Sequence, residues 1–392
     1  PIQINGASQV ITYLEGENMI SINKSEKFSS PAGISVAKGA KLTIDKEPER
    51  QGSIEVLNKT NVNKTGAAIG GNGGEDAGII HIKGGTVIAT SASNGAAIGA
   101  SASKSVKEIQ ISGGDVTAKS SGGAGIGTGS ANGQKRTGKI VIEGGTVNAS
   151  SWNGAGIGSG YGYAPGSSAI IAKIEIHGGM ITAYSKWGAC IGSGLDSSSK
   201  VLIDGGTICL DKKTTGYRKV AHIGMGESSN TQVQTDVTIT GGTICLKEAD
   251  RYIPRPIIYG WEKAGEKWQQ NKPKDGKGNP VYYTTADLTG IYENNTLVEK
   301  AGIEGSSYGF KDVRTDSSGK LYMYLPASEA VKASFGGVEF TGKVEAGKDE
   351  NVLEREQTSI DYQREVLKNM ALYDLEYARS MRVIDWTKIP AG

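Results

Sequence analysis

Hydrophobic and polar residues alternate in short runs through the middle of the chain, and these runs recur. A ten-residue pattern, [Ile/Val]-x-Ile-x-Gly-Gly-x-[Val/Ile]-x-[Ala/Leu], starts at residues 80, 109, 140, 174, 201 and 237. A second pattern, Gly-Ala-x-Ile-Gly, starts at residues 66, 95, 123, 154 and 188 and drifts to Ala-His-Ile-Gly at residue 221. A recurrence at about 30 residues is typical of a solenoid in which each coil is one repeat.

The alternation predicts short β-strands whose inward side chains form columns. Successive strand residues point to opposite faces, so Ile80 and Ile82 share one face, and Val87 and Ala89 return to it after the Gly-Gly bend. Strands this short cannot bury a hydrophobic face alone, so the coils must stack with parallel pairing. We therefore predict a mainly β chain that forms a right-handed parallel β-helix. Its two inward columns are Ile82, Ile111, Ile142, Ile176, Ile203 and Ile239, and Ile69, Ile98, Ile126, Ile157, Ile191 and Ile223.

The pattern changes outside the repeats and predicts further segments. Residues 1–65 alternate like strands but lack the glycine signature, which predicts an N-terminal cap and the first coils before the β-helix of residues 66–247. Residues 248–283 contain two closely spaced prolines and a polar, lysine- and glycine-rich stretch, which predicts a linker or long loop. Residues 284–354 return to short alternating runs and predict a small antiparallel β domain.

Residues 355–392 have helical periodicity instead. Apolar residues recur there at steps of three or four, which predicts a C-terminal α-helix with a wide apolar stripe. Such a face needs a partner, and its own domain, identical chains and a different protein are the alternatives. We expect the helix to serve in docking or oligomerisation through Val366, Met370, Tyr373, Tyr377, Met381 and Ile384.

Composition and charge exclude several classes of protein. The 58 glycines among 392 residues do not fall at every third position, which excludes collagen. A net charge of +2 without a basic patch gives no sign of nucleic-acid binding. No apolar run approaches the ~18 residues of a transmembrane helix. Three cysteines and three histidines predict neither a disulfide scaffold nor a metal site, and no cofactor motif is present.

As a set, the Gly-Ala-x-Ile-Gly and Ile-x-Ile-x-Gly-Gly repeats resemble the glycine-rich β-helical modules of Firmicute-type cell-surface proteins, which some phage structural proteins also carry. Residues 32–44 resemble the strand-rich stretch that precedes those modules, and residues 308–326 resemble the small β module that follows them. The resemblance covers residues 10–348. It implies a role in adhesion or spacing and carries over no catalytic residues.

The two ends of the chain depart from that family pattern. No LPxTG wall-sorting signal is present, and the C-terminal helix has no counterpart in the modules. The chain starts at Pro1 without a signal peptide, which predicts either a cytoplasmic start or a truncated chain. These departures favour a subunit of an extracellular or cell-surface assembly, or of a phage virion or tail fibre, over an anchored adhesin.

Charged residues on successive repeats offer the one catalytic hypothesis. Equivalent outward residues of a parallel solenoid stack about 4.8 Å apart. The position before Gly-Gly carries Glu143, His177 and Asp204 on consecutive repeats, and Glu175 lies two residues before His177. Carbohydrate-active β-helix enzymes, glycosidases or lyases, place carboxylates on neighbouring rungs because the reacting groups must flank one bond. The alternative is a solvated ladder of charges without a catalytic role.

Aromatic residues cluster in the loops of two adjacent coils. Trp152 and Trp187 each lie just before a Gly-Ala-x-Ile-Gly turn, and Tyr161 and Tyr163 belong to the same coils. Exposed aromatic rings combine an apolar face with a polar group and stack well on sugars. The predicted role is glycan binding, and packing against another part of the chain or a partner is the alternative.

Cysteines occupy an unusual outward position in the last two repeats. Cys209 and Cys245 fall at the same repeat position, where other coils have Ile, Thr or Asn. Either the face is covered, for example by residues 250–283, or it is an interface. Free buried thiols and a disulfide are both compatible with the spacing, whereas Cys190 is expected to fill a small space in the core.

These patterns predict a non-enzymatic structural or adhesive protein. We expect a rigid β-helical subunit that presents its loops to a partner, with a surface glycan as one candidate, and that assembles through residues 355–392 with itself or a larger structure. The alternative is the carbohydrate-active enzyme that would use Glu143, Glu175, His177 and Asp204.

Overall fold

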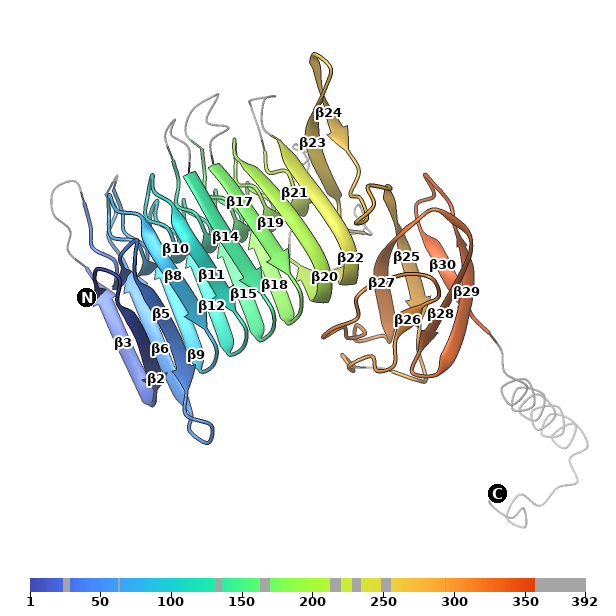
Figure 1. The fold of residues 1–392 in the computed structure, drawn as a ribbon, viewed down its shortest axis with the longest axis horizontal. Helices are drawn as coiled ribbons and strands as arrows, with labels where there is room; N and C mark the ends of the chain where they lie inside the picture. Colours follow the sequence, from blue (N-terminus) through green and yellow to red (C-terminus); the bar gives the residue numbers. More distant parts are fainter. Residues whose placement is uncertain are drawn as a thin grey trace, which may run out of the picture.

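The computed structural model describes residues 1–23, 29–62, 64–131, 136–162, 170–211, 220–227, 234–247, 255–292 and 294–356. A stack of parallel coils ends in a hairpin and is followed by a separate curled sheet (Figure 1). These described ranges contain no helix, and so none that could cross a membrane. The stripe of the predicted C-terminal helix, from Val366 to Ile384, lies outside them, as does Tyr163.

Each repeat folds into one coil of three strands. In one coil, β10 (Ile98–Gly99) comes from the Gly-Ala-x-Ile-Gly pattern, β11 (Val106–Ile111) from Ile-x-Ile, and β12 (Asp115–Ser120) from the residues after Gly-Gly. Each strand pairs in parallel with its equivalents in the coils before and after. The parallel solenoid predicted from the repeats is therefore confirmed.

The remaining coils follow the same plan, and the two strands beside the last Gly-Gly corners merge into the long β20 and β22. The other strands of the stack are β1 (Ile2–Ile4), β2 (Gln9–Leu14), β3 (Gly16–Ile22), β4 (Ile34–Val36), β5 (Lys41–Lys46), β6 (Gly52–Asn58), β7 (Ile69–Gly70), β8 (Ala77–Ile82), β9 (Thr86–Ser91), β13 (Ile126–Gly127), β14 (Arg136–Ile142), β15 (Thr146–Ser151), β16 (Ile157–Gly158), β17 (Ile170–Ile176), β18 (Met180–Ser185), β19 (Ile191–Gly192), β20 (Ser198–Leu210), β21 (Ile223–Gly224) and β22 (Thr235–Leu246).

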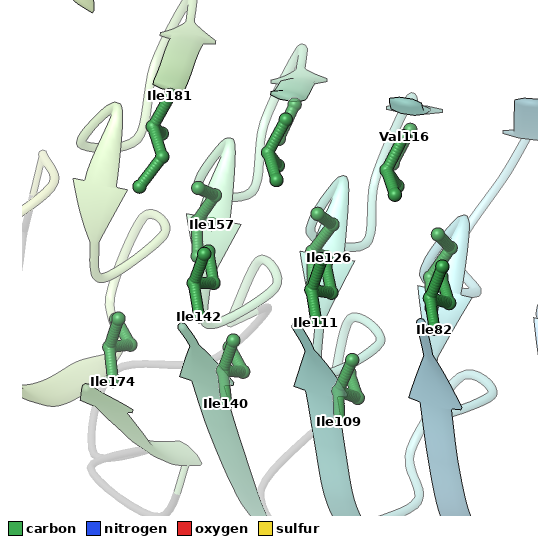
Figure 2. Packing of buried hydrophobic residues seen from close by; sticks show 14 of the residues in the cluster. Ile82, Ile109, Ile111, Val116, Ile126, Ile140, Ile142, Ile157, Ile174 and Ile181 are labelled. Atoms are coloured by element: carbon green, nitrogen blue, oxygen red, sulfur yellow. The ribbon is translucent and has the colours of Figure 1, made fainter. Parts of the chain in front are cut away.

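The predicted isoleucine columns form the core of the stack. Ile111 pairs in register with Ile82 on one side and Ile142 on the other, and Ile126 pairs in the same way with the isoleucines of its two neighbours. Every isoleucine of both columns is at most 1% exposed. The side chains stack from coil to coil (Figure 2), so each coil buries the apolar face of the next.

A glycine at the end of each short strand lets the coils approach closely. Gly127 has a φ of 138°, a conformation that L-residues rarely adopt. A Cβ atom added there would lie 2.0 Å from the carbonyl oxygen of Gly158 in the next coil. The Ile-Gly dipeptide therefore combines a core side chain with a corner that only glycine fits.

Residues for which the sequence predicted a linker contain a hairpin. β23 (Ile258–Ala264) and β24 (Lys267–Asn271) pair antiparallel. The start of β23 also adds a rung to the stack, because Ile258 pairs in parallel with Ile223. The prolines and polar residues of this segment masked the short strand alternation within it.

The curled sheet after the stack has its own core. Its strands lie in the order β26-β28-β29-β30-β25-β27, and its buried residues include Phe335 and Phe340. The sheet is mixed rather than antiparallel, because β30 returns beside β25 in the same direction. The strands are β25 (Val281–Asp287), β26 (Gly302–Ile303), β27 (Lys320–Pro326), β28 (Ser328–Phe335), β29 (Val338–Val344) and β30 (Asn351–Arg355).

Candidate functional site

The two loop tryptophans lie together on adjacent coils. The backbone N–H of Trp187 donates to the carbonyl oxygen of Trp152 at 3.0 Å. The Trp152 side chain is 53% exposed, and Lys186 Nζ lies 3.6 Å from the centroid of its ring and 5.4 Å from that of Trp187. A cation over an aromatic face stabilises the arrangement. The pair therefore forms a surface of rings and one ammonium group.

The predicted tyrosines contribute less to that surface. Tyr161 is half-buried, and its backbone is hydrogen-bonded to Gly122 and Ala131 of the preceding coil. Tyr163 lies outside the described residues. The structure thus places Trp152 and Trp187 side by side and gives Tyr161 a largely structural environment.

The column before Gly-Gly brings together two of the four catalytic candidates. His177 follows Ile176, and Asp204 follows Ile203, and these isoleucines pair in register on β17 and β20. His177 Nδ1 and Asp204 Oδ1 share a hydrogen bond of 2.7 Å at the partly exposed surface. A histidine held by a carboxylate can move protons, but the same pair also stabilises a charge ladder.

The two glutamates of the hypothesis have other partners. Glu143 Oε2 accepts a hydrogen bond of 2.9 Å from the Gln110 side chain. Glu175 Oε1 lies 2.6 Å from Lys173 Nζ, and Oε2 lies 3.9 Å from Lys139 Nζ. The hydrogen bond from Lys173 lowers the pKa of Glu175, and it outweighs burial, which acts in the opposite direction. Glu175 is therefore held as a carboxylate and is a poor proton donor near neutral pH.

A segment of the second domain lies across the last Gly-Gly corners of the stack. The backbone N–H groups of Gly242 and Gly206 donate to the carbonyl oxygens of Gly309 (2.9 Å) and Lys311 (2.7 Å). The N–H of Gly179 donates to Asp312 Oδ2 at 2.9 Å. We call residues 308–314 the docking segment, because it fixes the curled sheet to three consecutive coils.

The docking segment also reaches the candidate catalytic column. Lys311 Nζ donates to the carbonyl oxygen of Glu143 at 2.7 Å. Thr207, directly after the corner beside Asp204, donates to the carbonyl oxygen of Asp312 at 2.8 Å. The column therefore borders an interface within the chain, where its polar groups have a structural use.

The outward cysteines lie against the curled sheet. Cys209 and Cys245 pair in register on β20 and β22, and their Sγ atoms are 3.5 Å apart as free thiols. β27 covers this face, with the N–H of Tyr322 donating to Thr243 Oγ1 at 3.0 Å. The hydrogen bond with Cys209, and then burial, raise the pKa of the Cys245 thiol. β27 supplies this cover together with Tyr283, the last residue of the segment 250–283 that the sequence offered as one candidate.

Asp316 anchors the loop before β27 at the same interface. Its carboxylate accepts hydrogen bonds from the Tyr322 hydroxyl at 2.5 Å and from the backbone N–H of Lys320 at 2.8 Å. Burial alone would raise the pKa of Asp316, but these hydrogen bonds lower it overall. The ionised carboxylate therefore stabilises the folded sheet.

A column of lysines lies on the stack at a position that the two repeat patterns did not include. Lys139, Lys173 and Lys200 each directly precede the ten-residue pattern in consecutive repeats, and the register pairs them across β14, β17 and β20. We call these three residues the lysine column. Because a lysine stands one residue before the ten-residue pattern in three consecutive repeats, the sequence could have predicted this column. Within the described residues, no group of three His, Cys, Asp or Glu could hold a metal ion.

The repeats are also similar to a known family. A family model described as a beta helix repeat matches residues 80–102, 109–130, 140–161 and 174–195. Each matched segment starts with Ile-x-Ile and runs through the next Gly-Ala-x-Ile-Gly turn. No curated protein and no solved structure matches the chain. Over these four segments the chain is therefore similar to β-helix repeat proteins, in agreement with its parallel coils.

Proposed function

We propose that this chain is a non-enzymatic structural protein, a stiff β-helical spacer that contacts glycans through Trp152 and Trp187. The observation that carries the proposal is the pair of exposed Trp152 and half-buried Trp187 on adjacent coils of a parallel stack. Parallel pairing along the whole stack makes bending costly, because each coil is hydrogen-bonded to both neighbours. The docking segment adds the curled sheet to the same stiff body.

The geometry of the tryptophan pair suits a sugar ligand. Trp152 is exposed, and Lys186, whose ammonium group lies over its ring, offers a donor for hydroxyl groups. Aromatic rings stack on the apolar faces of sugars, while polar groups at their edges fix orientation. The pair lies in loops that a rigid scaffold positions, as binding residues commonly do.

The environment of the catalytic candidates supports a structural role. Glu175 is held by two lysines, and Glu143 is bonded to Gln110 while its carbonyl group binds Lys311. Only His177 and Asp204 contact each other. A glycosidase or lyase would need two groups free to act on one bond, and these partners disfavour that arrangement.

Retention on insoluble polysaccharides tests the glycan contact. The purified chain is applied to a panel of neutral cell-wall and plant polysaccharides, and the bound fraction is measured for the natural chain and for Trp152→Ala/Trp187→Ala. We expect retention on at least one polymer, reduced at least tenfold in the double variant. Trp268→Ala on the distant hairpin is the matched control and should bind normally. Equal binding by the natural chain and the double variant would refute the role of the pair.

Assembly through residues 355–392 is the second part of the proposal. The apolar stripe from Val366 to Ile384 in the sequence supports it, and it fits a cell-surface or virion subunit. The molar mass of the full chain and of residues 1–356 is compared by light scattering. We expect a defined oligomer, or a complex with a partner, only when the C-terminal segment is present. If the full chain and residues 1–356 both had the molar mass of a monomer, self-assembly through the C-terminal segment would be ruled out.

A further inference from the structure

A groove of about 520 Å³ lies against the lysine column and includes Glu175 in its lining. Lys173 and Lys200 line it from β17 and β20, and Lys272 and Lys274 line it from the segment after β24. Its ionised lining also includes Glu175 and Asp236, so four ammonium groups face two carboxylates.

The chain after β24 adds a rung beyond β22, on which Asp236 occupies the position next to Lys200. The N–H of Lys274 donates to the carbonyl oxygen of Val237 at 3.0 Å, and the N–H of Ile239 donates to that of Lys274 at 2.8 Å. This segment therefore runs parallel to β22, with Lys274 opposite Thr238. Lys272 precedes Lys274 by two residues, as Asp236 precedes Thr238, so Lys272 lies on the rung beyond Asp236.

Two of the four ammonium groups are available to a ligand. Lys173 is paired with Glu175 at 2.6 Å and Lys274 with Glu262 at 3.3 Å. Lys200 and Lys272 form no ion pair with any residue that the structure describes. Lys200 is exposed on its strand, and Lys272 Nζ lies 5.0 Å from the centroid of the Tyr282 ring. The groove thus offers two ammonium groups outside the ion pairs, and one of them, Lys272, lies beside an aromatic ring.

Positive charge continues from Lys272 into an adjoining groove. This second groove, of about 370 Å³, shares Lys272 with the first and is also lined by Tyr282, Arg255 and Lys348. Among the described residues, no carboxylate lines it, although Asp349 at its rim pairs with Arg255. An extended ligand can therefore meet cations at several points along one path.

We infer that this path binds an acidic polysaccharide, a glycan that carries carboxylate or phosphate groups along its chain. Lys200 and Lys272 bind its anionic groups, and Tyr282 packs against a sugar ring. Lys200 and Lys272 lie two rungs apart with Asp236 between them, a spacing of about 10 Å at about 4.8 Å for each rung, which suits a polymer with widely separated charges. DNA carries a phosphate about every 3.4 Å along each strand, and Glu175 and Asp236 would oppose so dense an anion.

Binding of defined polyanions tests the inference. Polygalacturonate supplies the carboxylate arm and a phosphomannan the phosphate arm, and affinity for the full chain is measured by biolayer interferometry at 50 and 200 mM salt. Lys200→Ala/Lys272→Ala should weaken binding at least tenfold for each of the two polymers that the natural chain binds. Lys107→Ala/Lys119→Ala, which removes two exposed lysines from another part of the stack, should leave it unchanged. Circular dichroism confirms that both variants are folded.

Several results would overturn the inference. It fails if neither polymer binds, if both lysine variants lose affinity equally, or if duplex DNA binds more tightly with the same dependence on Lys200 and Lys272. The outcome is separable from that of the proposed function. Trp152→Ala/Trp187→Ala should bind the acidic polymer normally, and the lysine variant should retain its binding to neutral polysaccharides.

Discussion

Replacing Gly127 by alanine tests the close stacking of the coils. The new Cβ would lie 2.0 Å from the carbonyl oxygen of Gly158 and 3.0 Å from Ile140 Cδ1. That carbonyl accepts a hydrogen bond of 3.0 Å from the N–H of Thr128. The substitution must therefore either move the next coil or break this bond.

The expected cost combines two effects. A residue held at the φ of 138° found for Gly127 costs about 1–3 kcal/mol in backbone strain. Losing or stretching an inter-coil hydrogen bond adds about 0.5–1.5 kcal/mol, and the displaced side chains beside Ile140 add more. We expect Gly127→Ala to lower the free energy of unfolding by about 3–5 kcal/mol, out of a total of about 5–15 kcal/mol for a typical domain.

Gly74→Ala is the matched control for this experiment. Gly74 also has a positive φ, 90°, but no atom lies within 4 Å of an added Cβ. It should therefore cost only the strain, about 1–2 kcal/mol. Equilibrium urea unfolding, followed by circular dichroism, measures both. If Gly127→Ala were no more destabilising than Gly74→Ala, the close packing of the coils would be wrong.

Three further substitutions or treatments probe other parts of the molecule. Ile142→Ala should cost about 2–5 kcal/mol in urea unfolding because it opens a cavity in the core, whereas Lys107→Ala should change stability by less than about 0.5 kcal/mol. Asp316→Asn should destabilise the protein at pH 7. Because the folded pKa of Asp316 is lowered, its contribution is full above the unfolded value of about 3.9 and is lost as the pH falls through the folded value, so variant and natural chain should converge in thermal melts at low pH. Cys245 should resist iodoacetamide at pH 8 in the folded protein and react in urea, as read by mass spectrometry, because its pKa is raised and β27 covers it.

The repeats made the solenoid predictable in detail. Ile82 and Ile126 could be assigned to inward columns because a strand alternates with a period of two and each coil repeats the same pattern. The register observed for Ile111 with Ile82 and Ile142 follows from this periodicity. Each coil pairs only with the coils next to it, so the repeated sequence pattern determines the strand register between successive coils.

Contacts between distant segments could not be predicted in this way. The docking segment meets Gly179 and Gly206 from more than one hundred residues away, and no periodicity links it to those corners. The lysine column was visible as a repeated residue, but the groove beside it depends on where the chain returns after β24. Contacts of this kind, between segments far apart in the sequence, are not encoded in the hydrophobic pattern of either segment.

Incubation with a retained polysaccharide tests the central claim most directly, namely that the protein holds glycans and does not cleave them. The natural chain is incubated with a polymer that binds it, and soluble reducing ends and unsaturated products are measured over a day. We predict full retention and no products above a protein-free blank. Time-dependent release of oligosaccharides that disappears when Glu143, Glu175, His177 and Asp204 are all changed to alanine would contradict the claim.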